Sequence, residues 1–385
     1  MFLNPSDRQM YIATNVGLYE QNGSQLVAFT VGNAKDAYFA ANSTRIIVTD
    51  MDKVYLNEIG QALVQSVTTF NNCCGVGYLA GYFVALTEVE SRLYYSQDGY
   101  TWEDLDFATV QQSSDWSVAL RVHRDMLVLF GSSSIEFWQP TGDSNNPFAP
   151  ITAVTANYGI RYASAVAEAG GALFFFGYDP KGDTSLYLLS GYEPVKVSNP
   201  DIDRIIQRSG LNEVRIDGFQ INGRSYLGLY LFTGDGTSTW WLDIELMVWT
   251  EITNDSDLFG VGNFLQVDTT LYGASVDTNT IFSIQDYAGE SDIPRTLTLD
   301  HLVSKDFDRF TVDSLRADVN GCSNIRLRVS RDGGETWGSY LSLTPAPPKR
   351  IQWNRLGTAR EFTFEVSSTA AGQIELSNLY VNAVN

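Results

Sequence analysis

Seven short apolar segments recur along the first three quarters of the chain at similar steps, and this recurrence constrains the fold more than any other feature. Each segment is rich in aromatic and branched aliphatic side chains, which favour β-strands. Measured between successive segments, the steps are 35, 37, 44, 46, 53 and 45 residues, counted at Tyr11, Ile46, Phe83, Leu127, Leu173, Tyr226 and Leu271. A blade of four short strands needs roughly 40 to 45 residues, so the pattern predicts a β-propeller.

Most of these anchor segments are followed by a second apolar segment that ends in a turn. Leu93–Tyr95 precedes Gln97-Asp98-Gly99, and Val54–Asn57 precedes Glu58-Ile59-Gly60. Asp-Gly pairs supply the positive φ angles of tight hairpins, so strands joined in this order form a meander. We predict about seven blades over residues 1–288, with six or eight as alternatives, because a terminal strand can close the ring from the other end.

The character of the chain changes after Gln285. Residues 286–294 (DYAGESDIP) are polar and contain Gly and Pro, which is typical of a linker. Residues 295–385 again alternate apolar and polar positions, and their number suits a separate domain. We therefore predict an all-β chain with a C-terminal β-sandwich-like domain at 289–385.

Composition bounds the class of protein. The chain has 385 residues, of which 44% are hydrophobic and 18% charged, so it can bury a sizeable core. No apolar run approaches the length of a transmembrane helix, and the N-terminus has no signal-peptide pattern, so we expect no membrane segment and folding in a cytoplasm. The three cysteines, Cys73, Cys74 and Cys322, form no disulfide or metal pattern and are expected to be buried.

The formal net charge of −20 excludes one class of function. Binding to nucleic acid by phosphate neutralisation needs clustered Lys and Arg, which an acidic chain does not supply. The simplest interpretation is that the acidic surface keeps the protein soluble.

The clearest local motif is an Asp box, S-x-D-x-G-x-T-W, which occurs once in full and once in a form one residue shorter. The box is a hairpin in which the Asp accepts backbone N–H bonds, a Gly takes positive φ and the Trp packs beneath. Its residues are predicted to be structural: Ser96, Asp98, Gly99, Thr101 and Trp102 in the short form, and Ser330, Asp332, Gly334, Thr336 and Trp337 in the full form. Asp boxes also occur in sialidases, which raises a sialidase-like or glycan-binding propeller as an alternative.

Other catalytic signals are weak. A sialidase needs arginines that converge on a substrate carboxylate, whereas Arg121, Arg124, Arg161, Arg204 and Arg208 lie in no recognisable motif. The two histidines, His123 and His301, are isolated, and the acidic turns at 179–183 and 254–257 lack the ligand spacing of a calcium loop. We predict no enzyme activity, no catalytic residue, no cofactor and no metal site.

Several segments, in order, resemble a known family. They are Met126–Phe148 (MLVLFGSSSIEFWQPTGDSNNPF), Ala172–Gly177, Thr239–Asp243 with Trp249–Glu251, the full Asp box and Gln352–Gly357. This series is similar to the packaged-DNA stabilisation, or tail-nozzle, proteins of short-tailed bacteriophages (podoviruses). The resemblance covers about Ala119 to the C-terminus.

The resemblance implies a structural virion protein of the phage tail, assembled in the host cytoplasm. Such a protein forms a homohexameric ring at the distal end of a short tail, attached to an adaptor beneath the portal and near tail fibres or spikes. It closes the DNA exit channel, retains the packaged genome and opens for ejection. The acidic charge then has a use, because an acidic channel wall lets DNA pass without adhesion. A third hypothesis, a receptor-binding tail component, predicts exposed aromatic side chains on blade loops.

Overall fold

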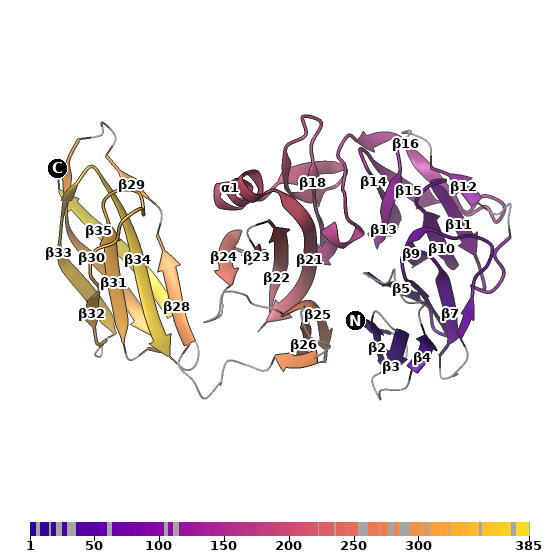
Figure 1. The fold of residues 1–385 in the computed structure, drawn as a ribbon, viewed down its shortest axis with the longest axis horizontal. Coiled ribbons are helices and arrows are strands. Elements are labelled where there is room, and N and C mark those ends of the chain that lie inside the picture. The colour runs from indigo at the N-terminus through magenta and orange to yellow at the C-terminus, as the bar shows by residue number, and fades with distance from the viewer. Residues whose placement is uncertain are drawn as a thin grey trace. The chain divides into compact units, whose positions relative to one another are not determined.

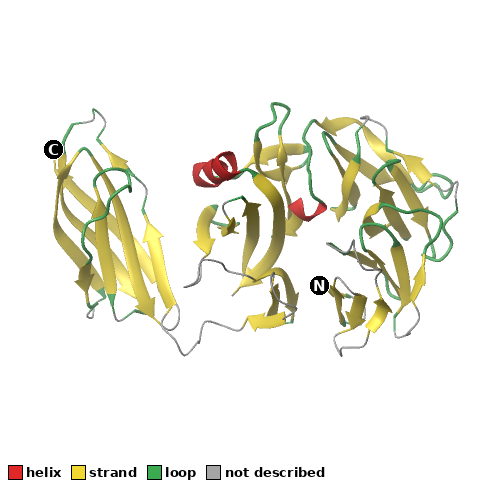
Figure 2. Ribbon diagram, in the orientation of Figure 1, coloured by secondary structure: helices red, strands yellow, loops and turns green. Residues whose placement is uncertain are grey.

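The computed structural model describes residues 1–385 except 5–7, 15–16, 21–24, 29–35, 60–63, 104–106, 111–114, 222, 235, 253–260, 269, 276–280, 285–292, 300, 305, 307, 323, 346–348, 371–374 and 385. The chain divides into two compact units, Met1–Ile284 and Gln285–Asn385. Most of the expected linker at 286–294 lies outside the described residues. Strands dominate both units (Figure 2).

Within the described residues, unit 1 consists of seven antiparallel sheets, each a meander of strands that are consecutive in sequence. Sheet 1 contains β1 (Phe2–Leu3), β2 (Met10–Thr14), β3 (Gly17–Glu20) and β4 (Gln25–Ala28). Sheet 2 contains β5 (Tyr38–Ala41), β6 (Arg45–Thr49), β7 (Val54–Glu58) and β8 (Val64–Ser66). Sheet 3 contains β9 (Cys73–Leu79), β10 (Tyr82–Thr87), β11 (Arg92–Ser96) and β12 (Phe107–Thr109).

The remaining sheets of unit 1 continue the same order. Sheet 4 contains β13 (Ser117–His123), β14 (Met126–Gly131), β15 (Ile135–Pro140) and β16 (Phe148–Ala156). Sheet 5 contains β17 (Val166–Ala169), β18 (Ala172–Tyr178), β19 (Thr184–Ser190) and β20 (Glu193–Lys196). Sheet 6 contains β21 (Leu211–Ile221), β22 (Arg224–Thr233), β23 (Gly236–Asp243) and β24 (Val248–Ile252). Sheet 7 contains β25 (Val261–Val267), β26 (Thr270–Ser275) and β27 (Ile281–Ile284).

The seven anchor segments of the sequence are the second strands of these seven sheets. Their apolar runs are continuous because both faces of each sheet are covered by its neighbours in the ring. In β18, for example, Leu173 and Phe175 pack in the cluster shared with sheet 4, whereas Phe174 and Phe176 pack in the cluster shared with sheet 6.

The sheets follow one another around a ring (Figure 1). First strands pack against first strands of neighbouring sheets, as β5 does against β9 and β21 against β25, so these strands lie closest to the ring axis. The ring closes where β1 packs against β25, and an exposed ion pair joins Arg8 Nη2 to Asp268 Oδ1 at 2.5 Å.

Successive turns of a meander lie at alternate ends of its sheet. The turns after the first and third strands of each sheet therefore share one end of the ring, which includes the short Asp box after β11. We call it the Asp-box end. The turn after the second strand and the connection to the next sheet lie at the opposite end, which we call the connector end.

One helix, α1 (Pro200–Ser209), was not predicted from the sequence. Asn199 caps it by accepting the N–H of Ile202 at 2.8 Å, and the helix ends at Gly210, whose φ is 66°. Ile202 is fully buried in the cluster between sheets 5 and 6. Ten residues are too few to give a clear helical period in the sequence. A 3₁₀ turn also occurs at Ala163–Ala165, and among the described residues no helix has the length and apolar character to cross a bilayer.

Unit 2 is a sandwich of two sheets. One contains β28 (Ile293–Thr298), β34 (Glu361–Ala370), β31 (Ile325–Ser330) and β32 (Leu341–Leu343), with β29 (Leu302–Val303) paired to β34. The other contains β33 (Arg350–Ala359), β30 (Phe310–Asn320) and β35 (Glu375–Val384). Phe310 and Val312 of β30 face a core that includes Trp353 and Phe364, and after a register irregularity at Val312/Ser314 the buried positions continue at Leu315 and Ala317.

Candidate functional site

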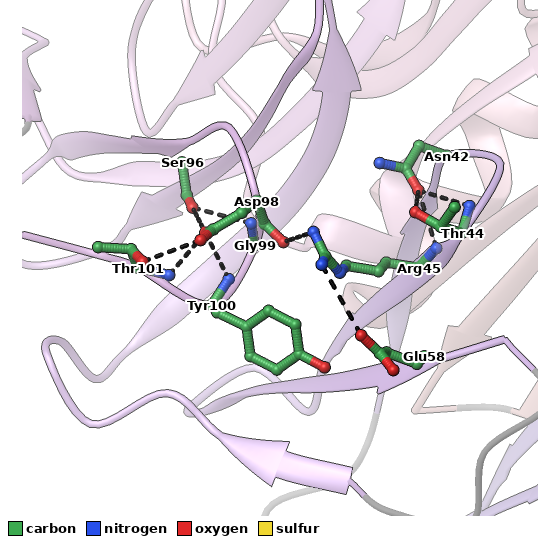
Figure 3. Close-up of polar contacts among 9 residues, drawn as sticks. All are labelled: Asn42, Thr44, Arg45, Glu58, Ser96, Asp98, Gly99, Tyr100 and Thr101. Atoms are coloured by element: carbon green, nitrogen blue, oxygen red, sulfur yellow. Dashed lines mark hydrogen bonds and ion pairs between the residues drawn. The ribbon is translucent and has the colours of Figure 1, made fainter.

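The short Asp box forms the turn after β11, at the Asp-box end of unit 1 (Figure 3). Asp98 Oδ1 accepts the backbone N–H groups of Tyr100 at 2.8 Å and Thr101 at 2.7 Å, and Asp98 Oδ2 accepts the Thr101 hydroxyl at 2.9 Å. Ser96 Oγ donates to Asp98 Oδ1 at 3.0 Å and accepts the N–H of Gly99 at 2.9 Å. One carboxylate thus satisfies most of the polar groups of the turn.

Gly99 and Trp102 attach this turn to the core. Gly99 has a φ of 74°, and a Cβ at this position would lie 3.1 Å from Phe83 and 3.2 Å from Leu56. The Trp102 indole N–H donates to the carbonyl of Gly99 at 2.7 Å, and its ring lies 5.3 Å from that of Phe70, centroid to centroid. The positive φ favours glycine here, and a Cβ would require the Phe83 and Leu56 side chains to shift by a few tenths of an ångström.

Arg45, at the start of β6, connects the turn to sheet 2 (Figure 3). Its Nη1 donates to the carbonyl of Asp98 at 2.6 Å, its Nη2 lies 3.7 Å from Glu58 Oε1, and its guanidinium lies 4.7 Å from the ring centre of Tyr100. The Asn42 side-chain oxygen accepts the N–H of Arg45 at 2.8 Å and so fixes the preceding turn. The Asp box therefore also joins two neighbouring sheets.

The full Asp box follows β31 in unit 2. Ser330 Oγ donates to Asp332 Oδ1 at 2.6 Å and accepts the N–H of Gly334 at 2.8 Å, and Asp332 Oδ1 accepts the N–H of Thr336 at 2.9 Å. The Thr336 hydroxyl donates to Asp332 Oδ2. Trp337 lies beneath the guanidinium of Arg328, 4.7 Å from it.

The carboxylates of both boxes are held in the charged form. Partial burial raises the pKa of Asp98, but the hydrogen bonds that it accepts outweigh burial, and the net pKa is lowered. The hydroxyls of Ser330 and Thr336 lower the pKa of Asp332 to about 2. Both acids serve as hydrogen-bond acceptors within their turns, which is a structural role.

Three of the arginines considered for a sialidase site contact carbonyls or an aromatic ring of the chain itself. The Arg121 guanidinium donates to the carbonyls of Leu120 and Ala163, at 2.8 Å each. Arg124 donates to the carbonyl of Gly171 at 3.3 Å, and Arg161 lies over the ring of Tyr162. Arg204 and Arg208 lie on α1.

Charged groups do meet near the ring axis, in a set that the sequence did not reveal. We call this set the axial cluster: Asp36, Tyr38, Arg121, Glu213, Arg215 and Asp217. Arg121 of β13 lies 4.3 Å from the ring centre of Tyr38, which is the first residue of β5. Arg215 of β21 lies 3.6 Å from Asp36 and 2.8 Å from Glu213. Because sheets 2, 4 and 6 are not neighbours, these contacts cross the axis.

Burial has the largest effect on the pKa values of Asp217 and Tyr38 in the axial cluster. It raises the pKa of Asp217 to about 6, although the N–H of Asn263, the N-terminal ammonium of Met1 and the charge of Arg215 act in the opposite direction. It also raises the pKa of Tyr38. The cluster holds three carboxylates and two guanidinium groups, and the N-terminal ammonium of Met1 adds a third cation that interacts with Asp217. An anionic ligand at Arg215 would have to displace the carboxylates already paired with it.

The remaining candidate residues give no site of their own. His123 Nδ1 lies 3.4 Å from Glu168, and His301 Nε2 lies 3.1 Å from Glu361. Asp179 accepts the N–H groups of Lys181 and Asp183, and the turn at 254–257 lies outside the described residues. Cys73 and Cys74 are buried and Cys322 half-buried. No group of three or more His, Cys, Asp or Glu in the described part of the chain is placed to hold a metal ion.

Solved structures resemble the chain only distantly. The extracellular domain of the one-component system BT4673 from B. thetaiotaomicron has a TM-score of 0.49 and 12% identity, over 76% of this chain and 39% of that one. The exo-β-1,3-galactanase of Phanerochaete chrysosporium has a TM-score of 0.35 and 9% identity, over 96% of this chain and 100% of the galactanase chain. The WD40 propeller of Doa1 has a TM-score of 0.41 and 11% identity, over 73% of this chain and 90% of the Doa1 chain. No function is transferred from these similarities.

The sequence itself identifies the family. No curated protein matches the chain. The family model described as "Bacteriophage P22 Gp10, beta-propeller" matches residues 3–245, which is more than half of the chain. The match begins well before Ala119, so the N-terminal sheets share the family's sequence, and it ends before the full Asp box and Gln352–Gly357. The predicted β-propeller is confirmed, and the chain belongs to the phage DNA-stabilisation protein family of the P22 Gp10 type, a family of virion proteins.

Proposed function

We propose that this protein is the tail nozzle of a short-tailed phage: a ring of six copies below the portal adaptor that closes the DNA exit channel and opens for ejection. The observation that carries the proposal is the family match over residues 3–245. A structural role also agrees with the two Asp boxes, whose carboxylates are occupied within their own turns.

The axial cluster bears on where DNA would pass. Side chains from three sheets cross the axis of the propeller, at contacts of 3.6 Å between Arg215 and Asp36 and 4.3 Å between Arg121 and Tyr38. Duplex DNA therefore does not pass through a single propeller. In the proposed ring, the channel lies between copies of the chain.

The distribution of charge supports a channel wall to which DNA does not adhere. Residues 1–284 contain 32 of the 45 acidic residues but 14 of the 25 basic ones, so most of the net charge of −20 belongs to unit 1. An acidic wall repels the phosphates of DNA at distances up to about 8 Å in physiological salt. A channel lined by Lys and Arg would contradict this part of the proposal.

Electron microscopy of the purified protein and of phage tails tests the proposal. We expect sixfold rings with a central channel, and the same rings at the distal end of tails. Monomers that never enter tails would contradict it.

The alternative is a sialidase-like or glycan-binding propeller, suggested by the Asp boxes. A fluorogenic sialoside separates the two functions. Turnover that is lost in Tyr38→Phe and Arg215→Gln would favour the alternative, because these residues are the axial groups available for such chemistry. We expect no turnover, because the axial arginines are already bonded within the chain.

A further inference from the structure

A large aromatic side chain is exposed at the connector end of unit 1. Trp116, in the connection between β12 and β13, is 65% exposed, and Val89, in the turn between β10 and β11, is 62% exposed. Ser91 joins the two segments, because its hydroxyl donates to the carbonyl of Asp115 at 3.2 Å and accepts the N–H of Ser117 at 3.3 Å. Tryptophan is highly buried on average in folded proteins, so a side chain that is 65% exposed departs from the usual pattern.

The backbone that carries Trp116 is fixed on both sides. Its carbonyl accepts the N–H of Ser132 at 2.8 Å. The neighbouring Asp115 carboxylate accepts the N–H of Ser133 at 2.7 Å and the hydroxyl of Ser134 at 3.1 Å. Trp116 is therefore presented by a segment bonded to sheets 3 and 4. Because this backbone is already ordered, little backbone entropy is lost when a partner covers Trp116.

Four carboxylates lie in the segments that carry this exposed pair and in a turn of the neighbouring sheet 2. We call Asp52, Glu88, Glu90 and Asp115 the acidic arc. The arc is continuous through hydrogen bonds, since Asp52 accepts the N–H of Asn72 at 3.2 Å and the carbonyl of Asn72 accepts the N–H of Glu88 at 2.8 Å. Two cations lie at the same turns: Lys53 follows Asp52 in sequence, and Arg92 Nη1 lies 2.7 Å from Glu90 Oε2. The arc therefore keeps an excess of negative charge around an apolar centre.

We propose that Trp116 and Val89 form a docking surface for a different virion protein, one that offers an apolar pocket rimmed by Lys and Arg. The proposal rests on the proposed function, which places the chain among other virion proteins. An acidic rim repels nucleic acid and favours a partner whose pocket is rimmed by Lys and Arg. Tryptophan is among the residues that dominate binding energy in protein interfaces, and charge complementarity around it selects the partner.

Complementation of a phage that lacks its own copy of this protein tests the proposal. Particles are assembled with wild-type protein or with Trp116→Ser, and their protein composition is measured by quantitative mass spectrometry after washing in low or high salt. In particles with Trp116→Ser we expect the amount of this protein to equal that in wild-type particles. The amount of one other virion protein should be at least about tenfold lower than in wild-type particles. Glu88→Gln with Glu90→Gln should weaken retention in low salt and reduce its salt dependence.

Leu246→Ser is the matched control, because Leu246 is 61% exposed at the Asp-box end. It should leave the composition unchanged, and purified Trp116→Ser should unfold at the wild-type temperature. Identical composition in Trp116→Ser and wild-type particles would overturn the inference and leave the nozzle proposal standing. Absence of the wild-type protein from particles would instead overturn the nozzle proposal. A change in self-association of purified Trp116→Ser would overturn the assignment to a different protein, because a second copy would then cover Trp116.

Discussion

Asp98 and Asp332 show how much a single carboxylate can organise. Each accepts a backbone N–H and a hydroxyl from the threonine that follows it, although the threonine is three residues further in one box and four in the other. The motif was readable in the sequence because every bond is local. The bond from Arg45 could not be predicted from the sequence, because Arg45 lies 53 residues before Asp98.

Replacing Asp98 by alanine should destabilise unit 1. The change leaves the N–H groups of Tyr100 and Thr101 without their acceptor, and the loss of such a turn or cap bond costs about 1–2 kcal/mol. Urea denaturation at neutral pH measures the free energy of unfolding. Gln97→Ala, an exposed neighbour, is the control and should change it little. Equal stability of the two variants would contradict the role of the carboxylate.

Asp217 should make stability depend on pH in the opposite sense from an ordinary paired acid. Burial raises its folded-state pKa to about 6, above the unfolded value of about 3.9. Between these values the folded state binds more protons than the unfolded state, so stability decreases as pH rises through the window. Asp217→Asn keeps an acceptor for the N–H of Asn263 and removes the buried charge.

The variant should therefore be more stable than wild type at pH above 7, by on the order of 1 kcal/mol, and the difference should vanish as pH falls toward 4. Thermal unfolding across this range provides the measurement. A difference that stays constant with pH would show that the charge of Asp217 is not its cause.

At the scale of elements, the strands buried on both faces were the most predictable part of the molecule. Segments such as Ala172–Phe176 are apolar at every position because neighbouring sheets cover both sides, and this gives a strong sequence signal. The axial cluster gave no such sequence signal, because Asp36 and Arg215 come together only when the ring has formed. The alternation of Glu213, Arg215 and Asp217 along one first strand was the available hint.

The inter-sheet clusters predict the cost of a large cavity. Phe175 is fully buried, 5.5 Å from the ring centre of Phe130 and 5.3 Å from that of Tyr187. Phe175→Ala should lower the free energy of unfolding by about 3–5 kcal/mol. Val248→Ala, at a position that is 51% exposed, should lower it far less. Similar losses in the two variants would contradict the packing described between sheets 4 and 5.

At the scale of the whole molecule, each unit has its own core. Among the described residues, the cluster around Val312 and Trp353 draws only on unit 2, and the six inter-sheet clusters draw only on unit 1. Separate cores unfold as separate cooperative units. Unit 1 in turn depends on every sheet to cover its neighbours, so it should unfold as one ring rather than blade by blade.

Scanning calorimetry of the full chain should therefore show two transitions. Trp353 is 3% exposed and its indole N–H donates to the carbonyl of Leu341 at 2.8 Å, so Trp353→Ala should lower the temperature of the unit 2 transition alone. Phe175→Ala should lower only the unit 1 transition, because the cluster it weakens contains no residue of unit 2. A single transition displaced by both substitutions would mean that the two units unfold together and stabilise one another.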